Sequence, residues 1–160
     1  MKNMSREFFY MGKTTMTLEG VIRQIDTFED FERKFTNELL DDDKQVCYYL
    51  ADLVFKYGGD YSAISEEAGY ASSYLGNIIN GHKNNPSRNV LIAMCLALGT
   101  TVEEVQQLLK YAGHAPLYVR RKRDVVIWFG FMKKLSVDEV DGLLEERGYA
   151  PITRLNNKSK

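Results

Sequence analysis

The stretch that decides the fold is ISEEAGYASSYLGNIINGHKNNPS, residues Ile64–Ser87. Its pattern predicts a short helix that ends at Gly69, a turn of a few residues and a second helix over 72–80. The second helix begins with small hydroxyl residues and stops at an Asn-Gly pair, which is typical of a helix end. Two helices joined this closely can present the second one to the major groove of DNA.

Composition bounds the class of protein. The chain has 160 residues, of which 44% are hydrophobic, so we expect about one domain with an extension. The N-terminal segment MKNMSREFFYMGK lacks the apolar core of a signal peptide, and no apolar run reaches 18 residues. We therefore expect a cytoplasmic protein that does not enter a membrane. Cys47 and Cys95 lie among apolar neighbours and are expected to be core thiols.

The net charge of −1 hides an uneven distribution of charge along the chain. Residues 17–67 carry 13 acidic and 5 basic side chains, which gives −8, whereas residues 68–135 carry 3 acidic and 9 basic ones, which gives +6. The basic half contains helix 72–80 and the run Arg120-Arg121-Lys122-Arg123. A local basic field can attract a polyanion, although such a run is also typical of a solvated helix start.

The rest of the chain is predicted to be helical, because no segment shows the strict alternation of a strand. We expect a short helix over 17–26 and then a helix that Thr27 caps, with Phe28, Phe31, Phe35 and Leu39 on one face. Acidic residues at 41–43 should begin the next helix. The apolar stripes predict a core that contains Val46, Leu50, Leu53, Val54, Tyr57, Leu75, Ile78, Ile79, Val90, Leu91, Met94, Cys95 and Leu98.

The C-terminal part of the chain repeats itself. Residues 88–117 and 123–152 align without a gap at a shift of 35 and are identical at 11 of 30 positions. Each copy holds a predicted capping box, with Ser or Thr followed three residues later by Glu. Each copy then has a Leu-Leu pair, a Gly suited to a left-handed helix end and a Pro that stops continuation. Two copies are too few for a repeat array, so we expect a duplicated helical hairpin packed on the first domain.

The stretch Ile64–Ser87 resembles the Cro/lambda-repressor-like (XRE-type) helix-turn-helix family. The resemblance rests on Ile64, Ala68, Gly69, Tyr74-Leu75, Ile78, Asn80-Gly81 and Pro86-Ser87 and covers roughly residues 41–112. The continuation and the second hairpin are similar to a group of uncharacterised bacterial helix-turn-helix proteins. The implied fold is all-α, a lambda-repressor-like bundle with an added C-terminal hairpin. Its expected parts are an extension (1–40), the helix-turn-helix domain (41–117), the second hairpin (118–152) and a tail (153–160).

The resemblance implies a DNA-binding transcriptional regulator of bacterial or phage type that reads double-stranded DNA with helix 72–80. Small reading helices generally act in pairs, so a homodimer is expected, with the duplicated hairpin or the Phe28 helix as its surface. The base or phosphate contacts near the start of the helix are expected from Ser72, Ser73 and Asn77. Contacts with the phosphate backbone of the DNA are expected from Asn80, Lys83, Asn84, Arg88, Arg120, Arg121, Lys122 and Arg123.

Several features depart from the family pattern and keep a second hypothesis open. The predicted reading helix has no Arg, Lys or Gln, and only Asn77 can make a bidentate contact with a base. Gly76 lies in the middle of it, and Glu66 and Glu67 precede it. The alternative is a protein-interaction module, such as an antitoxin, an inhibitor or an adaptor, built on the same scaffold. Its acidic N-terminal half would then carry the function.

The sequence offers little for catalysis or metal binding. His82 and His114 are the only histidines, and neither has a companion at metal-ligand spacing. We therefore expect no enzyme activity, no metal and no cofactor. The aromatic set Tyr111, Tyr118, Trp128, Phe129 and Phe131 is typical of a core, but part of it could form an exposed interaction patch.

Overall fold

The computed structural model describes residues 13–36, 39, 45–83 and 85–153, and the side chains from residue 18 onward. Within these ranges the chain forms nine helices and no strand, so the all-α prediction is confirmed. The helices are α2 (Lys13–Gln24), α3 (Phe28–Phe35), α4 (Gln45–Tyr57), α5 (Tyr61–Glu67), α6 (Tyr74–Ile79), α7 (Arg88–Leu98), α8 (Val102–Tyr111), α9 (Lys122–Met132) and α10 (Val137–Glu146). None of the helices in the described ranges is long and apolar enough to cross a membrane.

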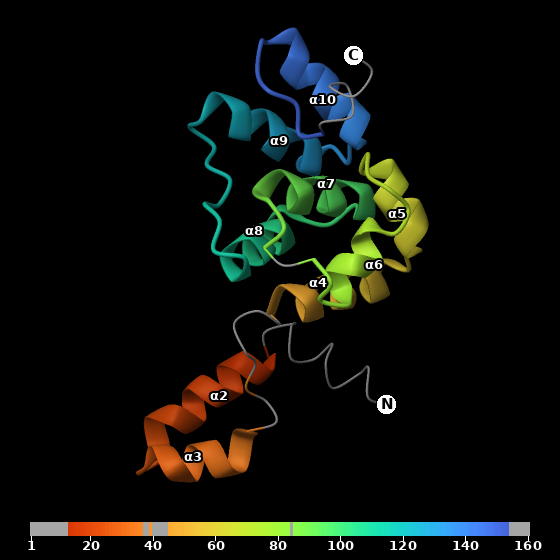
Figure 1. Cartoon of the computed structure of the whole chain (residues 1–160). Coiled ribbons are helices and arrows are strands. Elements are labelled where there is room, and N and C mark those ends of the chain that lie inside the picture. The colour runs from red at the N-terminus through yellow and green to blue at the C-terminus, as the bar shows by residue number, and fades with distance from the viewer. Residues whose placement is uncertain (1–12, 37–38, 40–44, 84, 154–160) are drawn as a thin grey trace.

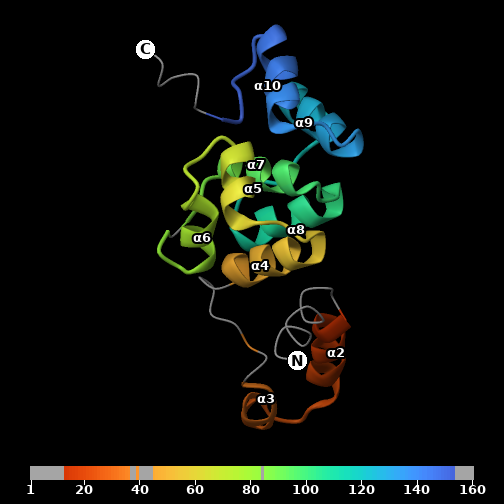
Figure 2. The same cartoon turned by 90° about the vertical axis from the view of Figure 1, so that its right-hand side faces the viewer.

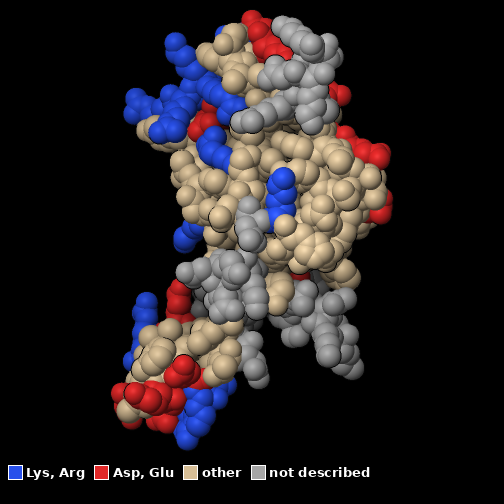
Figure 3. All heavy atoms as spheres, in the orientation of Figure 1, with Lys and Arg blue, Asp and Glu red and all other residues tan. Residues whose placement is uncertain are grey.

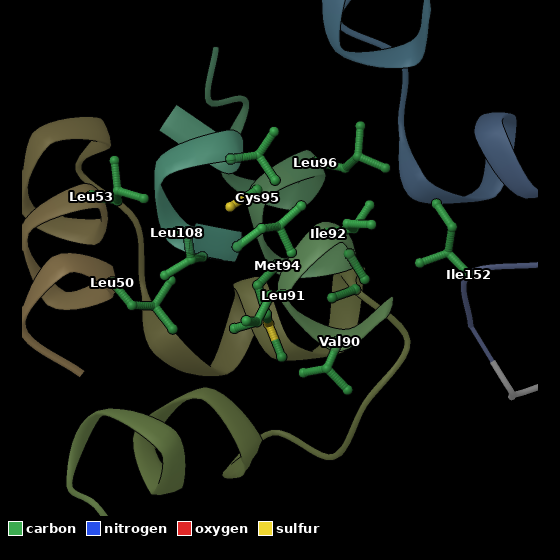
Figure 4. Close-up of a cluster of buried hydrophobic side chains, with 14 of the residues drawn as sticks. Leu50, Leu53, Val90, Leu91, Ile92, Met94, Cys95, Leu96, Leu108 and Ile152 are labelled. Carbon is green, nitrogen blue, oxygen red and sulfur yellow. The ribbon is translucent and has the colours of Figure 1, made fainter. Parts of the chain in front are cut away.

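The core is centred on α7. Figures 1 and 2 show α7 between α4, α5, α6 and α8 on one side and α9 and α10 on the other. Every side chain from Val90 to Leu96 is buried, as expected for a helix covered on both sides. In Figure 4, Leu50 of α4, Leu91 and Leu108 point toward one another. The predicted core positions are buried here, except Tyr57, Ile79 and Leu98, which are half-buried at its margin.

The helix ends follow from local sequence. The side chains of Asp60, Ser87 and Thr101 each accept a hydrogen bond from the backbone N–H three residues later. Thr101 and Glu104 form the complete predicted capping box. Only half of the second box forms, because the Ser136 hydroxyl accepts from Glu139 N but the Glu139 carboxylate does not return the bond.

The two N-terminal helices differ in part from expectation. Helix α2 begins four residues earlier than predicted, and α3 ends at Phe35, so Leu39 does not share its face. The Thr27 hydroxyl does accept from Asp30 N, as predicted. Phe31 is buried between its aromatic neighbours, but Phe28 is 67% exposed. Figures 1 and 2 show α2 and α3 apart from the rest of the helices, and the predicted start at 41–43 lies outside the described residues.

The repeat corresponds to two helical hairpins, α7–α8 (the first hairpin) and α9–α10 (the second hairpin). In the first, Arg88 donates to the carbonyl oxygens of Ala115 and Pro116 at 2.8 and 3.1 Å. In the second, the equivalent residue Arg123 donates to the carbonyl oxygens of Ala150 and Pro151 at 2.9 and 3.2 Å. Ala150 and Pro151 are the repeat equivalents of Ala115 and Pro116. The repeated Arg and Ala-Pro residues thus tie the start of each hairpin to its own end.

The contacts between the hairpins are reciprocal. Arg88 pairs with Asp124, and Arg123 pairs with Asn89, the residue equivalent to Asp124. Helix α7 also packs against α10, while α8 packs against α9. If successive hairpins were stacked by simple translation, each would contact the next in the same way, so Arg123 would contact a third hairpin and not Asn89 of the first. Reciprocity therefore indicates that an approximate two-fold axis relates the two hairpins.

Candidate nucleic-acid interface

Helices α5 and α6 form the segment that was predicted to approach DNA, and a buried hydroxyl holds them together. Ser65 Oγ donates to the carbonyl oxygen of Tyr61 at 2.7 Å and accepts from Leu75 N at 3.0 Å. Leu75 and Ile78 are fully buried in the core. Gly69 adopts a φ of 89°, which a side chain would strain, so the turn between the helices needs this glycine. The outer edge of α6 is thereby fixed relative to α5.

Helix α6 is shorter than predicted. It spans Tyr74–Ile79 rather than 72–80, because Tyr74 N bonds to the carbonyl oxygen of Ala71 in a turn. Ser73 takes the N-cap position, but its side chain makes no capping hydrogen bond, and Asn80 takes the C-cap position. Ser72 and Ser73 therefore lie exposed in the turn before the helix rather than on its first turn.

The predicted contact residues around α6 do lie near one another. Ser72, Ser73, Asn80 and Lys83 are exposed, and Asn77 is half-buried. The carbonyl oxygen of Asn77 accepts from Lys83 N at 3.2 Å, which folds the loop back over the helix end. Lys83 Nζ then lies 4.7 Å from the centre of the Tyr74 ring, a cation–π distance. Asn84, which was predicted to lie near the DNA backbone, is outside the described residues.

The space beside Gly76 bears on how α6 could approach a partner. A Cβ added there would meet only Tyr61 Cδ2, at 3.8 Å, an ordinary contact. The fold itself therefore does not require glycine at this position. A helix surface without a side chain at its middle allows close approach of another backbone.

Arg88 was predicted to hold phosphate, but the structure commits it to internal partners. Its guanidinium bonds to both carboxylate oxygens of Asp124 at 3.2 and 3.0 Å, in addition to the two carbonyl oxygens of its own hairpin. The Asp124 side chain is 5% exposed and that of Arg88 is 21% exposed. A bidentate pair of this kind satisfies most of the donors of the guanidinium, so it has little left to offer a phosphate.

Arg123 has a similar structural position at the start of α9. It is half-buried, and its guanidinium donates to three oxygens of the chain, including Asn89 Oδ1 at 3.1 Å. Burial, followed by the nearby charge of Arg88, lowers the pKa of Arg123 below its ordinary value. The repeat alignment contained a signal of this structural role, because Arg88 and Arg123 are identical residues at equivalent positions. Each repeat also ends with the Ala-Pro pair that its arginine contacts.

The other basic residues of the run are accessible. Arg120, Arg121 and Lys122 are exposed, and Figure 3 shows basic side chains gathered over the start of α9. In Figure 1, this end of α9 lies across the α7–α8 hairpin from α6, and the surface near α6 is mostly uncharged in Figure 3. The structure therefore does not bring the basic run next to the edge formed by Ser72, Asn77 and Lys83.

Other candidate chemistry is sparse. Among the described residues, no three His, Cys, Asp or Glu side chains gather as metal ligands would. His114 Nε2 donates to the carbonyl oxygen of Pro86 at 2.8 Å, a structural contact. Burial raises the pKa of the Cys95 thiol to about 12, so this thiol is a poor nucleophile. An open hollow of about 700 Å³ lies between α8 and Trp128 of α9.

Comparison with known proteins adds no relative to this geometry. No family model matches the chain, and neither a curated protein nor a solved structure does.

Proposed function

We propose that the chain is a DNA-binding transcriptional regulator of the Cro/lambda-repressor-like helix-turn-helix type, with α6 and the turn before it in the major groove. The supporting observation is the α5–α6 unit. Buried Ser65 and the core residues of α6 fix the two helices, while Ser72 and Ser73 are exposed and Asn77 is half-buried. An outward polar edge on a rigidly held second helix suits insertion into a groove.

The chemistry of this edge defines the kind of binding. Asn77 carries a side-chain amide that can make a bidentate contact with adenine, and exposed Asn80 carries another at the end of α6. Ser72 and Ser73 suit phosphate oxygens, and Lys83 lies at the other end of α6. Arg120, Arg121 and Lys122 could reach phosphates only farther along a bound duplex. Affinity in this proposal is mainly electrostatic, with modest sequence preference for each copy and two copies acting together.

Salt dependence provides the test. A fluorescein-labelled 30-base-pair duplex of random sequence is titrated with the full chain at 50 and 200 mM salt, with anisotropy as the readout. Neutralising three or four phosphates predicts an affinity about 40-fold to 150-fold lower at the higher salt. We expect the Ser72→Ala/Asn77→Ala/Lys83→Ala variant to bind at least tenfold more weakly than the parent.

A matched control removes one positive charge far from α6. The Lys34→Ala variant, on exposed α3, should bind as the parent does, and circular dichroism should show that both variants remain folded. Absence of binding to any duplex at 50 mM salt would overturn the proposal. Equal binding by the triple variant would exclude α6 as the reading element.

The competing function is a protein-interaction module on the same scaffold. One observation favours it specifically: Val125, Phe129 and Met132 expose apolar surface along one side of α9. That surface lies on the second hairpin, not on the acidic N-terminal half where the sequence had placed the interaction.

A further inference from the structure

The two-fold relation between the hairpins gives each surface of the first hairpin a counterpart on the second. In the first hairpin, one face is covered by α4, α5 and α6 and carries Val90, Leu91, Met94 and Leu108. All four side chains are buried, three of them completely. This face is the one through which the first hairpin joins the rest of the fold.

The counterpart on the second hairpin has no cover among the described residues. A shift of 35 places Val125, Val126, Phe129 and Leu143 at the same four positions. Val125 is 42% exposed and Phe129 is 47% exposed, while Val126 and Leu143 are half-buried. Together with Arg147 these residues line a groove of about 310 Å³ between α9 and α10. We call these five residues the groove face.

Charges of opposite sign border the groove face. Lys122 and Lys133 lie at the two ends of α9, three residues before Val125 and four after Phe129, so they share its outer side. On α10, Glu139 and Glu146 flank Leu143 at spacings of four and three. All four charged side chains are exposed. Arg147, which also lines the groove, is paired with Glu146 at 3.5 Å and so offsets one of these negative charges. The face therefore has a basic edge on α9, a largely apolar middle and an excess of negative charge along α10.

We propose that the groove face binds the groove face of a second copy of this chain in a two-fold dimer. A two-fold interface pairs each surface with itself, so it must be self-complementary. When two copies meet face to face, α9 of one lies against α10 of the other, the apolar middles meet and each basic edge meets an acidic edge. An unrelated apolar helix would fill the groove equally well but would leave both charged edges unmatched.

The geometry also sets the strength of the association. Two helices of 10 or 11 residues, about 16 Å long and about 10 Å apart, offer a face of roughly 300 Å² for each copy. The total of about 600 Å² is below the roughly 1,200 Å² of stable complexes. The dimer should therefore be weak and dependent on concentration, with charge pairing as its selective element.

Sedimentation velocity of the full chain from 1 to 300 µM, without DNA, measures this association. We expect the weight-average sedimentation coefficient to rise with concentration, and the Phe129→Glu variant to associate at least tenfold more weakly. Phe55→Glu is the matched control, since Phe55 is 57% exposed on α4 and far from the groove face. A parent chain that stays monomeric up to 300 µM would overturn the proposal.

A charge exchange separates self-pairing from other occupants. The Lys122→Glu/Lys133→Glu variant and the Glu139→Lys/Glu146→Lys variant should each fail to associate alone. Mixed together, they should associate as the parent does, because every basic edge again meets an acidic one. If the mixture stays monomeric, or if Phe28→Glu rather than Phe129→Glu abolishes association, the occupant is α3 or another segment and the proposal fails.

The dimer and the proposed DNA binding can fail separately. The sedimentation readout contains no DNA, although Lys122 borders both surfaces. A chain that dimerises without binding duplex refutes the regulator, whereas a monomer that binds duplex refutes only the dimer.

Discussion

The two hairpins have similar sequences but different surroundings. Leu108 and Leu143 are the same residue at equivalent positions on α8 and α10, yet Leu108 is fully buried and Leu143 is half-buried beside an open groove. Both hairpins keep the Ser or Thr cap, the left-handed Gly near the end and the Arg bound to Ala-Pro. The local sequence pattern therefore builds each hairpin, whereas the neighbouring helices determine whether a given side chain is buried.

The reciprocal contact between the hairpins shows a second difference. Arg88 meets a carboxylate, that of Asp124, whereas Arg123 meets an amide, that of Asn89. One half of the two-fold contact is therefore a buried ion pair and the other half a charge–dipole hydrogen bond. The same arginine contact is thus present in one molecule with a charged partner and with a neutral one.

The largest contrast should come from the matched leucines. Leu108→Ala removes a fully buried side chain and leaves a cavity beneath α4, so we expect a loss of about 3–5 kcal/mol in the free energy of unfolding. Leu143→Ala should cost less than about 1.5 kcal/mol, because its side chain is partly in solvent. Urea unfolding measures both at one protein concentration. Equal losses would show that the groove face is covered in solution.

The ion pair between the hairpins gives the next contrast. Asp124→Asn keeps the shape but replaces the buried carboxylate with an amide, and we expect a loss of about 1–3 kcal/mol, typical of a hydrogen bond to a charged group. Asn89→Asp creates the missing second ion pair near the start of α7 and should stabilise by about 0.5–1 kcal/mol. Thermal unfolding should shift in opposite directions for the two variants. A shift in the same direction would contradict the reciprocal arrangement.

Local features of this fold were predictable from the sequence because their causes are local. The caps at Thr27 and Thr101 depend on a side chain and an N–H three residues away, and the structure confirms them. The duplicated hairpin follows from the alignment at a shift of 35. DNA binding by the edge of α6 stays a prediction, because a side chain facing outward does not by itself identify its ligand.

The candidate site was less predictable because it depends on partners distant in sequence. Arg88 belongs to a basic half of the chain, but its ion-pair partner lies 36 residues away, and nothing near Arg88 in sequence indicates it. Phe129 and Phe131 are two residues apart, yet one is exposed and the other is buried. Helical spacing places them on different sides of α9 but does not say which side is covered. For Arg88, the one signal in the sequence was that the repeat conserves an arginine at the equivalent position, Arg123.

The smallest contrast concerns Glu104 and Glu139, the glutamates of the two predicted capping boxes. Glu104 accepts from Thr101 N and Lys56 Nζ, both at 2.9 Å, and from the hydroxyl of Tyr57, whereas Glu139 is exposed and makes none of these contacts. Burial alone would raise the pKa of Glu104, but these hydrogen bonds outweigh it and hold the pKa below its ordinary value. Glu104→Gln should cost about 1–2 kcal/mol at pH 7, and Glu139→Gln less than about 0.5 kcal/mol.

The pH dependence of Glu104 distinguishes its charge from its shape. Because its folded pKa is depressed, the carboxylate stabilises the fold fully above its unfolded pKa of about 4.3, and this contribution is lost as pH falls through the folded pKa. The difference in stability between the parent and Glu104→Gln should therefore shrink as the pH is lowered from 7 toward 3. Urea unfolding at several pH values measures it, with Glu139→Gln as the flat control. A difference that stays constant with pH would mean that Glu104 acts through packing, which would make the two capping boxes more alike than their contacts indicate.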